Sequence, residues 1–193
     1  MPLSGHGPFL SVVIPFYRGS RLLPRCLDGL QKQDCAFPFE VLVIDDGSGA
    51  RLPAVGRPQR FSRFTLRMVS RPHRGQSAAT NYGIREAAGE YLLLFAQDMI
   101  AAPGLLREHA RIHADQPDRA LAVLGFMPYH PALPPSDLYA FLLSDAQFAF
   151  GDLRDGTYID PAKYFYAPNL SVHREWLIKH GLFDEELEYG FQD

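Results

Sequence analysis

A single apolar segment near the middle of the chain most constrains the fold. The run Tyr91-Leu92-Leu93-Leu94-Phe95 follows Gly89-Glu90 and leads through Ala96-Gln97 to Asp98. It has the length of a strand and no alternation of polar and apolar residues, which is typical of a central strand covered on both faces. Asp98 is therefore expected where a strand ends, at the edge of a sheet. In open α/β sheets, ligands bind beyond the carboxyl ends of parallel strands, so this carboxylate is a candidate binding group.

The rest of the chain alternates between strand-like and helix-like patterns. Apolar and β-branched stretches predict strands, and apolar residues at helical spacing predict helices. The predicted strands are 9–14, ended by Pro15, then 39–44, 65–70, 121–126 and 169–172, and the predicted helices are 21–32, 76–88, 104–113 and 174–180. Such alternation indicates right-handed crossovers. The expected fold class is α/β, with a mostly parallel central sheet and helices on both faces.

Two local departures from this pattern carry information. In the helix predicted at 76–88, the first turns present polar residues inward, which suits the lining of a site, and Gly83 indicates close approach of a neighbouring backbone. Between residues 126 and 168 the alternation breaks down, and the chain is rich in proline and aromatic residues. An aromatic, loop-rich region beside a polar crevice suits stacking on a sugar ring or another acceptor.

Length and composition fit one domain with a sizeable core. The chain has 193 residues, 47% of them hydrophobic, and a formal net charge of −3, which gives no overall attraction to nucleic acid. Cys26 and Cys35 lack metal-site spacing and are expected to be free buried thiols. No signal-peptide pattern or run of transmembrane length is visible. The expected location is the cytoplasm, with or without peripheral contact to a membrane.

Positive charge gathers between Asp46 and Glu86, where the chain has no acidic residue. One interpretation is a solvated basic face. The other is contact with an anionic acceptor or a membrane surface through the Arg-rich segment 51–74. The arginines between the two acidic residues are Arg51, Arg57, Arg60, Arg63, Arg67, Arg71, Arg74 and Arg85.

Polar and aromatic residues follow the predicted strands. Taken singly, each has a structural interpretation: Asp45-Asp46-Gly47-Ser48 is an ordinary turn sequence, and Arg71 is typical of a surface charge. Their convergence on one edge of the sheet is what indicates a binding site. The residues concerned are Pro15 to Tyr17 after the first strand, Asp45 and Asp46 after the second, Arg71 after the third and Asp98 after the fourth.

Four segments of the chain resemble the family 2 glycosyltransferases with the GT-A fold. They are Ser11–Arg18, Val41–Ser48, Arg74–Tyr91 and Asn169–Glu175, in the order and at about the spacing of the family. The resemblance covers nearly the whole chain and implies a single GT-A domain, 1–193, with a donor-binding half, 1–125, and an acceptor and catalytic half, 126–193. Family members continue beyond Asp193, so the second half is expected to be incomplete.

The same resemblance implies which residues bind a nucleotide-sugar donor and an acceptor. Pro15, Phe16 and Tyr17 would flank the base, Asp45 and Asp46 would bind the base or ribose, Arg71 would touch the base, Ser77 and Asn81 would add to the donor side, and Asn169 and Ser171 would lie on the acceptor side. The DxD motif of the family falls on Ala96-Gln97-Asp98. Asp98 is thus the expected ligand of a divalent metal, Mg²⁺ or Mn²⁺, while Ala96 replaces the first carboxylate.

The catalytic base implied by the resemblance is Asp193, preceded by Gln192 where the family has glutamate. The expected function is inverting transfer of a sugar, from a UDP-sugar, to the hydroxyl of a carbohydrate or lipid-linked acceptor. The alternative is a relative that holds a nucleotide or sugar without turnover, which Ala96 and Gln192 favour. A dinucleotide-dependent oxidoreductase is disfavoured, because Leu52 stands where the third glycine after Gly47-Ser48-Gly49 belongs.

Overall fold

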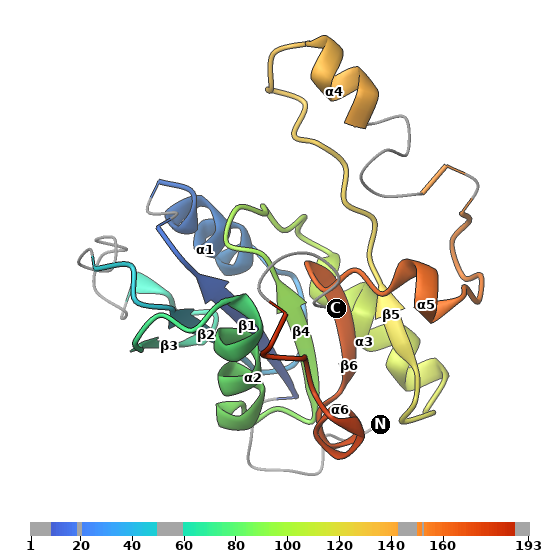
Figure 1. Ribbon diagram of the computed structural model, residues 1–193. Coiled ribbons are helices and arrows are strands. Elements are labelled where there is room, and N and C mark those ends of the chain that lie inside the picture. Colours follow the sequence, from blue (N-terminus) through green and yellow to red (C-terminus); the bar gives the residue numbers. More distant parts are fainter. Residues whose placement is uncertain (1–8, 19–20, 50–59, 143–149, 152, 188–193) are drawn as a thin grey trace.

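The structure, a computed structural model, describes residues 9–18, 21–49, 60–142, 150–151 and 153–187. These residues contain a six-stranded sheet with the order β3-β2-β1-β4-β6-β5 (Figure 1). Its strands are β1 (Leu10–Phe16), β2 (Phe39–Asp45), β3 (Thr65–Ser70), β4 (Tyr91–Phe95), β5 (Ala122–Leu124) and β6 (Asn169–His173). The helices are α1 (Leu23–Gln31), α2 (Gln76–Glu86), α3 (Leu105–Asp115), α4 (Asp137–Phe141), α5 (Pro161–Tyr164) and α6 (Arg174–His180).

The sheet is mostly parallel, as predicted. β1 pairs in parallel with both β2 and β4, and β2 pairs in parallel with β3. β6 is the exception: it lies between β4 and β5 and runs antiparallel to both. The carboxyl ends of β1 to β4 therefore meet at one edge of the sheet, and the amino end of β6 lies at that same edge.

The predicted end of the first strand at Pro15 is wrong, because β1 continues to Phe16. Pairing with β4 ends at Val13, whereas pairing with β2 continues to Phe16. The carbonyl of Phe16 accepts a hydrogen bond from the amide of Asp46, so Phe16 faces β2 and Pro15 faces the β4 side. Proline has no amide hydrogen to donate, and on the β4 side the ladder has already ended.

Helices cover both faces of the sheet, and each face has its own apolar layer. On one face, α1 and α3 pack against strand residues that include Val12, Ile14 and Leu93. On the other face, α2 and α6 pack against residues that include Val13 and Leu94. The alternation of Val12, Val13 and Ile14 between the two layers explains why this strand is apolar throughout.

Gly83 lets α2 approach the sheet closely. A Cβ added at this position would lie 2.5 Å from Cγ1 of Val13 and 3.1 Å from Cγ1 of Ile44. Contacts of 2.5 Å are shorter than carbon atoms allow, so any larger residue would push the helix outward. Gly83 therefore marks a close approach, but the predicted neighbour is wrong: side chains of β1 and β2, rather than a backbone, lie against it.

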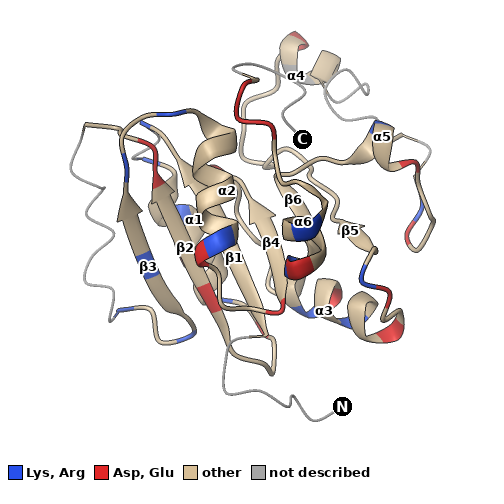
Figure 2. Cartoon of the chain, turned by 60° about the horizontal axis from the view of Figure 1, so that its bottom comes forward, with Lys and Arg blue, Asp and Glu red and all other residues tan. Residues whose placement is uncertain are grey.

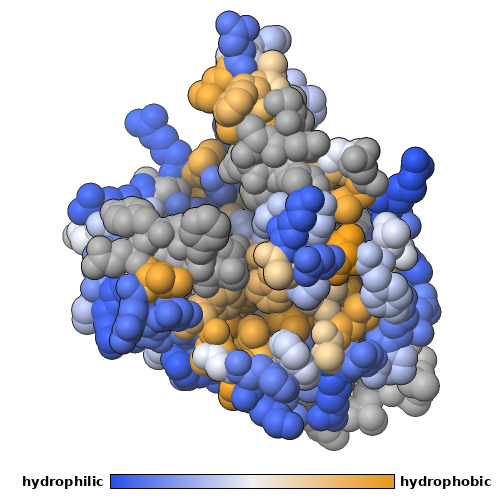
Figure 3. Space-filling view, turned by 45° about the vertical axis from the view of Figure 1, so that its right-hand side comes forward, coloured by the Kyte–Doolittle hydropathy of each residue, from blue (hydrophilic) through white to orange (hydrophobic). Residues whose placement is uncertain are grey.

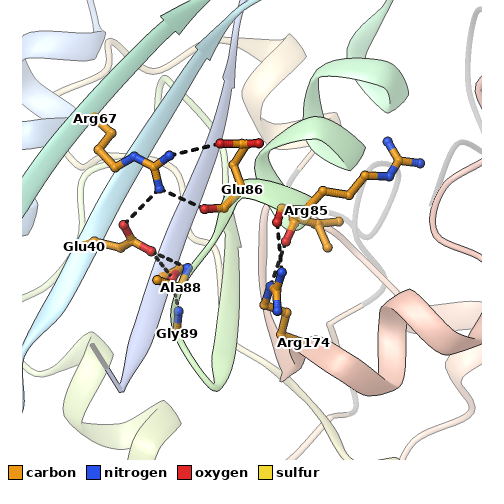
Figure 4. A network of polar contacts seen from close by, with 9 residues as sticks. Glu40, Arg67, Arg85, Glu86, Ala88, Gly89 and Arg174 are labelled. Atoms are coloured by element: carbon orange, nitrogen blue, oxygen red, sulfur yellow. Dashed lines mark hydrogen bonds and ion pairs between the residues drawn. The ribbon is translucent and has the colours of Figure 1, made fainter. Parts of the chain in front are cut away.

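A polar network holds the carboxyl end of α2 at the edge of the sheet opposite the strand ends (Figure 4). The buried carboxylate of Glu40 accepts hydrogen bonds of 2.7 Å from the Ser11 hydroxyl and from the amide of Ala88. Arg67 donates to the carbonyl of Glu86 at 2.8 Å. Arg174 donates to the carbonyls of Ile84 and Arg85 at 3.0 and 2.9 Å. These arginines satisfy carbonyl groups that a helix end leaves without partners.

The described residues of 126–168 form a projecting arm that leaves the sheet after β5 and carries α4 (Figure 1). Hydrophobic residues lie on its surface (Figure 3), and its most exposed large apolar side chains among the described residues are Phe126, Leu138, Phe141 and Tyr158. Phe150 packs edge-on against Phe126 and Tyr166, with ring centroids 5.2 and 5.8 Å apart. Among the described residues, no helix is long and apolar enough to cross a membrane.

Candidate functional site

Four loops at the carboxyl ends of β1 to β4 form one connected rim. Hydrogen bonds join them in turn: the amide of Tyr17 donates to Gln97 at 3.2 Å, the amide of Arg18 to the Ser48 hydroxyl at 3.0 Å, and the amide of Gly75 to Asp46 at 2.9 Å. Figure 2 shows acidic residues at the end of β2 and basic residues on the segment from β3 to α2. The predicted convergence of the strand ends on one edge is therefore what the fold produces.

Asp45 closes the turn after β2. One carboxylate oxygen accepts hydrogen bonds from the amide and hydroxyl of Ser48, at 3.0 and 2.5 Å, and the other accepts from the Ser70 hydroxyl at 3.0 Å. Asp45 is buried. Gly47 in this turn has φ +72°, and a Cβ there would lie 2.6 Å from the amide nitrogen of His73, so glycine is required. The carboxylate of Asp45 thus ties β2 to the end of β3.

Asp46 supports the loop between β3 and α2. Its two carboxylate oxygens accept hydrogen bonds from the amides of Arg74 and Gly75, both at 2.9 Å. The imidazole Nδ1 of His73 lies 2.7 Å from the same carboxylate. Asp46 is buried, whereas the His73 side chain is 55% exposed. The carboxylate of Asp46 therefore holds the loop in place, and the imidazole of His73 remains exposed.

Tyr17 and His73 form an aromatic pair on the rim. Their rings stack with centroids 4.5 Å apart and planes 17° apart. The guanidinium carbon of Arg18 lies 4.8 Å from the centre of the Tyr17 ring. His73 was not among the site residues expected from the sequence. Its position two residues after Arg71, in the loop that follows β3, could have indicated that it belongs to the rim. Pro15 lies within β1, and Phe16 has its ring buried in the core.

Arg71 points along α2. Its guanidinium donates to the carbonyl of Ala78 at 3.0 Å and lies over the ring of Tyr82, 4.3 Å from the ring centre. Its amide donates to the carbonyl of Asp45 at 2.8 Å. Arg71 thus joins the end of β3 to the first turns of α2, and part of its side chain remains accessible at the rim.

Asp98 follows β4 and is exposed. Within the described part of the chain, its carboxylate has no hydrogen-bond or ion-pair partner. It lies close to Cys26, whose thiol is 3.7 Å from the carbonyl of Ala96. Burial first, and then the charge of Asp98, hold the pKa of Cys26 well above its usual range. Cys26 and Cys35 are both free and buried, as predicted, while Asp98 is a carboxylate available to a ligand.

Ser77 and Asn81 lie on the inner face of α2 and are both buried. The hydroxyl of Ser77 has no hydrogen-bond partner among the described residues. Asn81 holds the segment after α6: its side chain donates to the carbonyl of Phe183 and to Glu185, each at 2.9 Å, and accepts from the amide of Phe183 at 3.0 Å. The polar inner face of α2 therefore contacts the segment that follows α6, a contact that the spacing of residues along the sequence did not indicate.

Asn169 and Ser171 lie on the face of β6 that packs against α3. Asn169 is buried and donates to the carbonyl of Phe126 at 3.4 Å. The hydroxyl of Ser171 is fully buried between His109 and His113, 2.8 Å from a ring nitrogen of each. Ser171 therefore does not face the rim, where an acceptor-side residue was expected.

The two histidines form a buried cluster that the sequence analysis did not identify, although their spacing on one helix was visible. Burial is the main cause that lowers the pKa of His109 to about 4, with the charge of His113 second. Burial likewise lowers the pKa of His113 to about 4, with His173 as the second cause. Both imidazoles are therefore neutral at physiological pH and act as packing and hydrogen-bonding groups.

Some residues named in the sequence analysis lie outside the described part of the chain. Asp193 and Gln192 lie outside the described residues, as do Arg51 and Arg57. Three other arginines expected on the basic face have side-chain partners: Arg60 pairs with Asp28, Arg63 donates to the carbonyl of Gln33 at 3.1 Å, and Arg67 pairs with Glu86 at 3.1 Å. For these three side chains, the structure favours a role in the fold.

Relatives of known name are similar to nearly the whole chain. A validoxylamine A glucosyltransferase of Streptomyces hygroscopicus subsp. jinggangensis (strain 5008) is 30% identical over 216 residues, which cover 98% of this chain and 50% of that protein. An uncharacterized glycosyltransferase, YfnE, of Bacillus subtilis (strain 168) is 26% identical over 236 residues, covering 95% of this chain and 58% of the relative. The chain thus spans about half the length of these curated relatives.

Solved structures show the same fold. Residues 1–349 of S. aureus TarS superpose with a TM-score of 0.70 and 20% identity, covering 94% of this chain and 52% of that one. The mannosyltransferase PcManGT from Pyrobaculum calidifontis, solved with GDP-Man and Mn²⁺, superposes with a TM-score of 0.64 and 22% identity, covering 94% and 49%. These neighbours have the GT-A fold, which agrees with the predicted fold class.

The family is shown by a match along the sequence itself. The family model described as glycosyl transferase family 2 matches residues 11–135, which run from β1 through the rim loops and β5 into the projecting arm. The match includes the turn that holds Asp45 and Asp46, the aromatic pair and Asp98. With the sheet order, the connected rim and these similarities in agreement, the chain belongs to glycosyl transferase family 2.

Proposed function

We propose that the chain is the donor-binding and catalytic part of an inverting glycosyltransferase, which moves a sugar from a nucleotide-sugar to an acceptor hydroxyl with the help of a divalent metal. The observation that carries this proposal is Asp98, an exposed carboxylate without a partner among the described residues, on the same rim as the Tyr17–His73 pair. Family membership supports the reaction class. The donor is proposed as a UDP-sugar, because TarS was solved with UDP and with UDP-GlcNAc.

Donor recognition is proposed for the rim loops. Tyr17 and His73 offer aromatic surface for the base, with Pro15 and Arg71 beside them. Asp45 and Asp46 would contribute mainly by holding their loops, since their carboxylates already accept hydrogen bonds from serine hydroxyls and from backbone amides. Phe16, Ser77 and Asn81 are buried, so their proposed contribution to donor binding is to shape the site from behind.

A divalent metal, Mg²⁺ or Mn²⁺, fits the residues present if the donor completes its coordination. No group of three or more His, Cys, Asp or Glu side chains in the described part of the chain is arranged to hold a metal. Asp98 would supply one carboxylate oxygen, and such ions take their other ligands from substrate phosphates and water. When bound, the metal neutralises the charge that grows on the departing nucleoside diphosphate. PcManGT, solved with GDP-Man and Mn²⁺, supports this choice.

Asp193 is proposed as the base that takes the proton of the acceptor hydroxyl while the hydroxyl oxygen attacks the anomeric carbon. Attack from the side opposite the leaving group inverts the configuration, and no covalent intermediate with the protein is needed. The acceptor is proposed to be a carbohydrate or a lipid-linked sugar. Exposed rings on the projecting arm, such as Phe126 and Tyr158, offer surfaces on which a sugar ring can stack.

A second candidate function is binding of a nucleotide or sugar without turnover, and Ala96 is the observation that favours it, because it lacks the first carboxylate of the DxD motif. One experiment separates the two. Thermal unfolding is measured with UDP, GDP and ADP, with Mn²⁺ or with EDTA, and transfer from a panel of UDP-sugars is then assayed. A saturating nucleotide at about a hundredfold excess over Kd should raise Tm by roughly 5–10 °C. Turnover of a UDP-sugar supports the enzyme, and binding without turnover supports the second candidate.

A further inference from the structure

Gln97 joins two rim loops at a point where the strands that carry them have separated. The ladder between β1 and β4 ends at the pair Val13 and Leu94. Beyond it, the side chain of Gln97 pairs with the backbone of Tyr17: its oxygen accepts from the Tyr17 amide at 3.2 Å, and its nitrogen donates to the Tyr17 carbonyl at 3.3 Å. A carboxamide has one acceptor and one donor side, so it pairs with a residue's backbone much as a neighbouring strand would.

Side chains, rather than a ladder, hold the loop after β1. Arg18, next to Tyr17, has φ +53°, a left-handed conformation that is unfavourable for a residue other than glycine. Such a conformation persists where the surroundings over-determine it. Gln97 fixes the loop from the β4 side, and Ser48, itself bonded to Asp45, fixes it from the β2 side through the amide of Arg18 at 3.0 Å.

Because the backbone of Tyr17 is fixed by Gln97, the position of the Tyr17 ring depends on Gln97 as well. The ring stacks on His73, and His73 is held by Asp46 at 2.7 Å, so one half of the aromatic pair is anchored through β2 and the other half through Gln97. Removing Gln97 would leave the ring held by the stack itself, by the tether at Arg18 and by the hydrogen bond from the Asp46 amide to the carbonyl of Phe16. The residue next to Gln97 is Asp98, which means that the same short loop carries the proposed metal ligand.

We propose that Gln97 is a positioning residue for donor binding: through its two hydrogen bonds to the Tyr17 backbone, it places the Tyr17–His73 pair to receive the base of a nucleoside diphosphate. The inference rests on the proposed function, since it assumes that the rim takes a nucleotide-sugar. Gln97 itself touches no reacting atom in this scheme. It acts on affinity for the nucleotide and leaves the chemical step unchanged.

The test compares Gln97→Ala with the matched control Gln31→Ala. Gln31 also bridges two segments through its carboxamide, donating to Ser62 and accepting from the amide of Arg63, but it lies at the end of α1 away from the rim. In calorimetry with Mn²⁺, Gln97→Ala should weaken UDP about fivefold or more and raise the donor KM by the same factor, with kcat unchanged. Gln31→Ala should match the unaltered protein. A fall in kcat at unchanged KM would overturn the assignment.

A double-mutant cycle tests whether Gln97 acts through Tyr17. In the Tyr17→Ala background, Gln97→Ala should change the UDP Kd by less than about twofold, because the ring that it places is gone. A full effect in that background would mean that Gln97 acts elsewhere, for example on Asp98, and would overturn the proposal.

Hydrogen exchange in the ligand-free protein separates this inference from the proposed function. Gln97→Ala should speed exchange of the Tyr17 amide about tenfold or more, and Gln31→Ala should not. An unchanged Tyr17 amide would overturn the positioning role even if UDP binds. Faster exchange at Tyr17, together with no binding of UDP, GDP or ADP to the unaltered protein with Mn²⁺, would overturn the proposed function and with it the donor role of Gln97.

Discussion

Asn81, midway along α2, pairs through its carboxamide with the backbone of Phe183, accepting from its amide at 3.0 Å and donating to its carbonyl at 2.9 Å. The residue before this contact, Leu182, has φ +65°, so the chain turns sharply after α6 before it meets α2. Asn81 therefore fixes a turn that apolar packing alone would not define. The anchored segment lies alongside α2 (Figure 1).

Replacing this anchor should destabilise the fold. Asn81→Ala leaves the amide and carbonyl of Phe183 without their partner and should lower the free energy of unfolding by about 2–4 kcal/mol, measured in urea. Arg85→Ala is the control: Arg85 is 3.8 Å from Glu185 and exposed, so the loss should stay within about 0.5 kcal/mol. Equal losses for the two variants would contradict the role given to Asn81.

The Asp98 carboxylate should be required for metal-dependent nucleotide binding. Asp98→Ala should abolish the part of UDP affinity that EDTA removes and leave the thermal stability of the ligand-free protein unchanged, because Asp98 has no partner among the described residues. Calorimetry with and without Mn²⁺ measures both quantities. Asp115→Ala, which removes a carboxylate paired with Arg111 on α3 at 2.9 Å, should keep the full metal effect. An unaltered metal effect in Asp98→Ala would rule out Asp98 as the ligand.

Stability should fall on mild acidification because of the histidines between α3 and β6. The pKa of His109 is about 4 in the fold, below the ordinary value of 6.5 that holds in the unfolded chain. Above pH 6.5 its contribution is fully present. As the pH falls toward 4, the unfolded chain takes up the proton first, and the free energy of unfolding should drop by up to about 1.4 kcal/mol per pH unit for this group.

His113 shares this direction, with a pKa also near 4. Urea unfolding at a series of pH values between 7 and 4 measures the slope. His109→Gln should reduce the slope of the unfolding free energy against pH by the share of about one bound proton, since a glutamine side chain does not titrate. A slope that does not change in His109→Gln would show that other groups cause the acid sensitivity.

Gly83→Ala should destabilise the protein although alanine is the better helix former. The intrinsic gain of about 1 kcal/mol should be exceeded by the overlap of the new Cβ with Val13, for a net loss of about 1–2 kcal/mol. Introducing Val13→Ala removes the overlapping methyl group. In that background, Gly83→Ala should be neutral or stabilising in urea unfolding. A net gain in the unaltered background would mean that α2 can shift outward without cost.

Several features of the fold follow from local sequence. The strand at 65–70 has the predicted ends, and its partial exposure matches its position at one edge of the sheet. Asp98 lies beyond β4 because the apolar run stops at Phe95, and Gly83 marks a close contact because only glycine lacks a Cβ. Such signals can be read from sequence because side-chain size, polarity and strand or helix period act over a few neighbouring residues.

The direction of a strand in the sheet and the hydrogen-bond partners of polar side chains could not be read from local sequence. β6 has the same alternating pattern whether it runs parallel or antiparallel, so its reversed placement between β4 and β5 was decided only by the path of the chain in three dimensions. Asn81 and Ser171 were expected at a binding site because they fall in segments that resemble the glycosyltransferase family. Their carboxamide and hydroxyl groups instead bond to Phe183 and to His109 and His113, far away in sequence.

The sequence by itself determined the family, the order of strands and helices along the chain, and the loops that carry the rim. Only the tertiary structure decided which of the polar residues remain available to a ligand. Asp98 and His73 remain exposed, whereas Asp46, Asn81 and Ser171 form their hydrogen bonds inside the fold. The physical reason is that a side chain's capacity to bond is a property of the residue, whereas its partner is set by whichever groups the packed chain brings within about 3 Å.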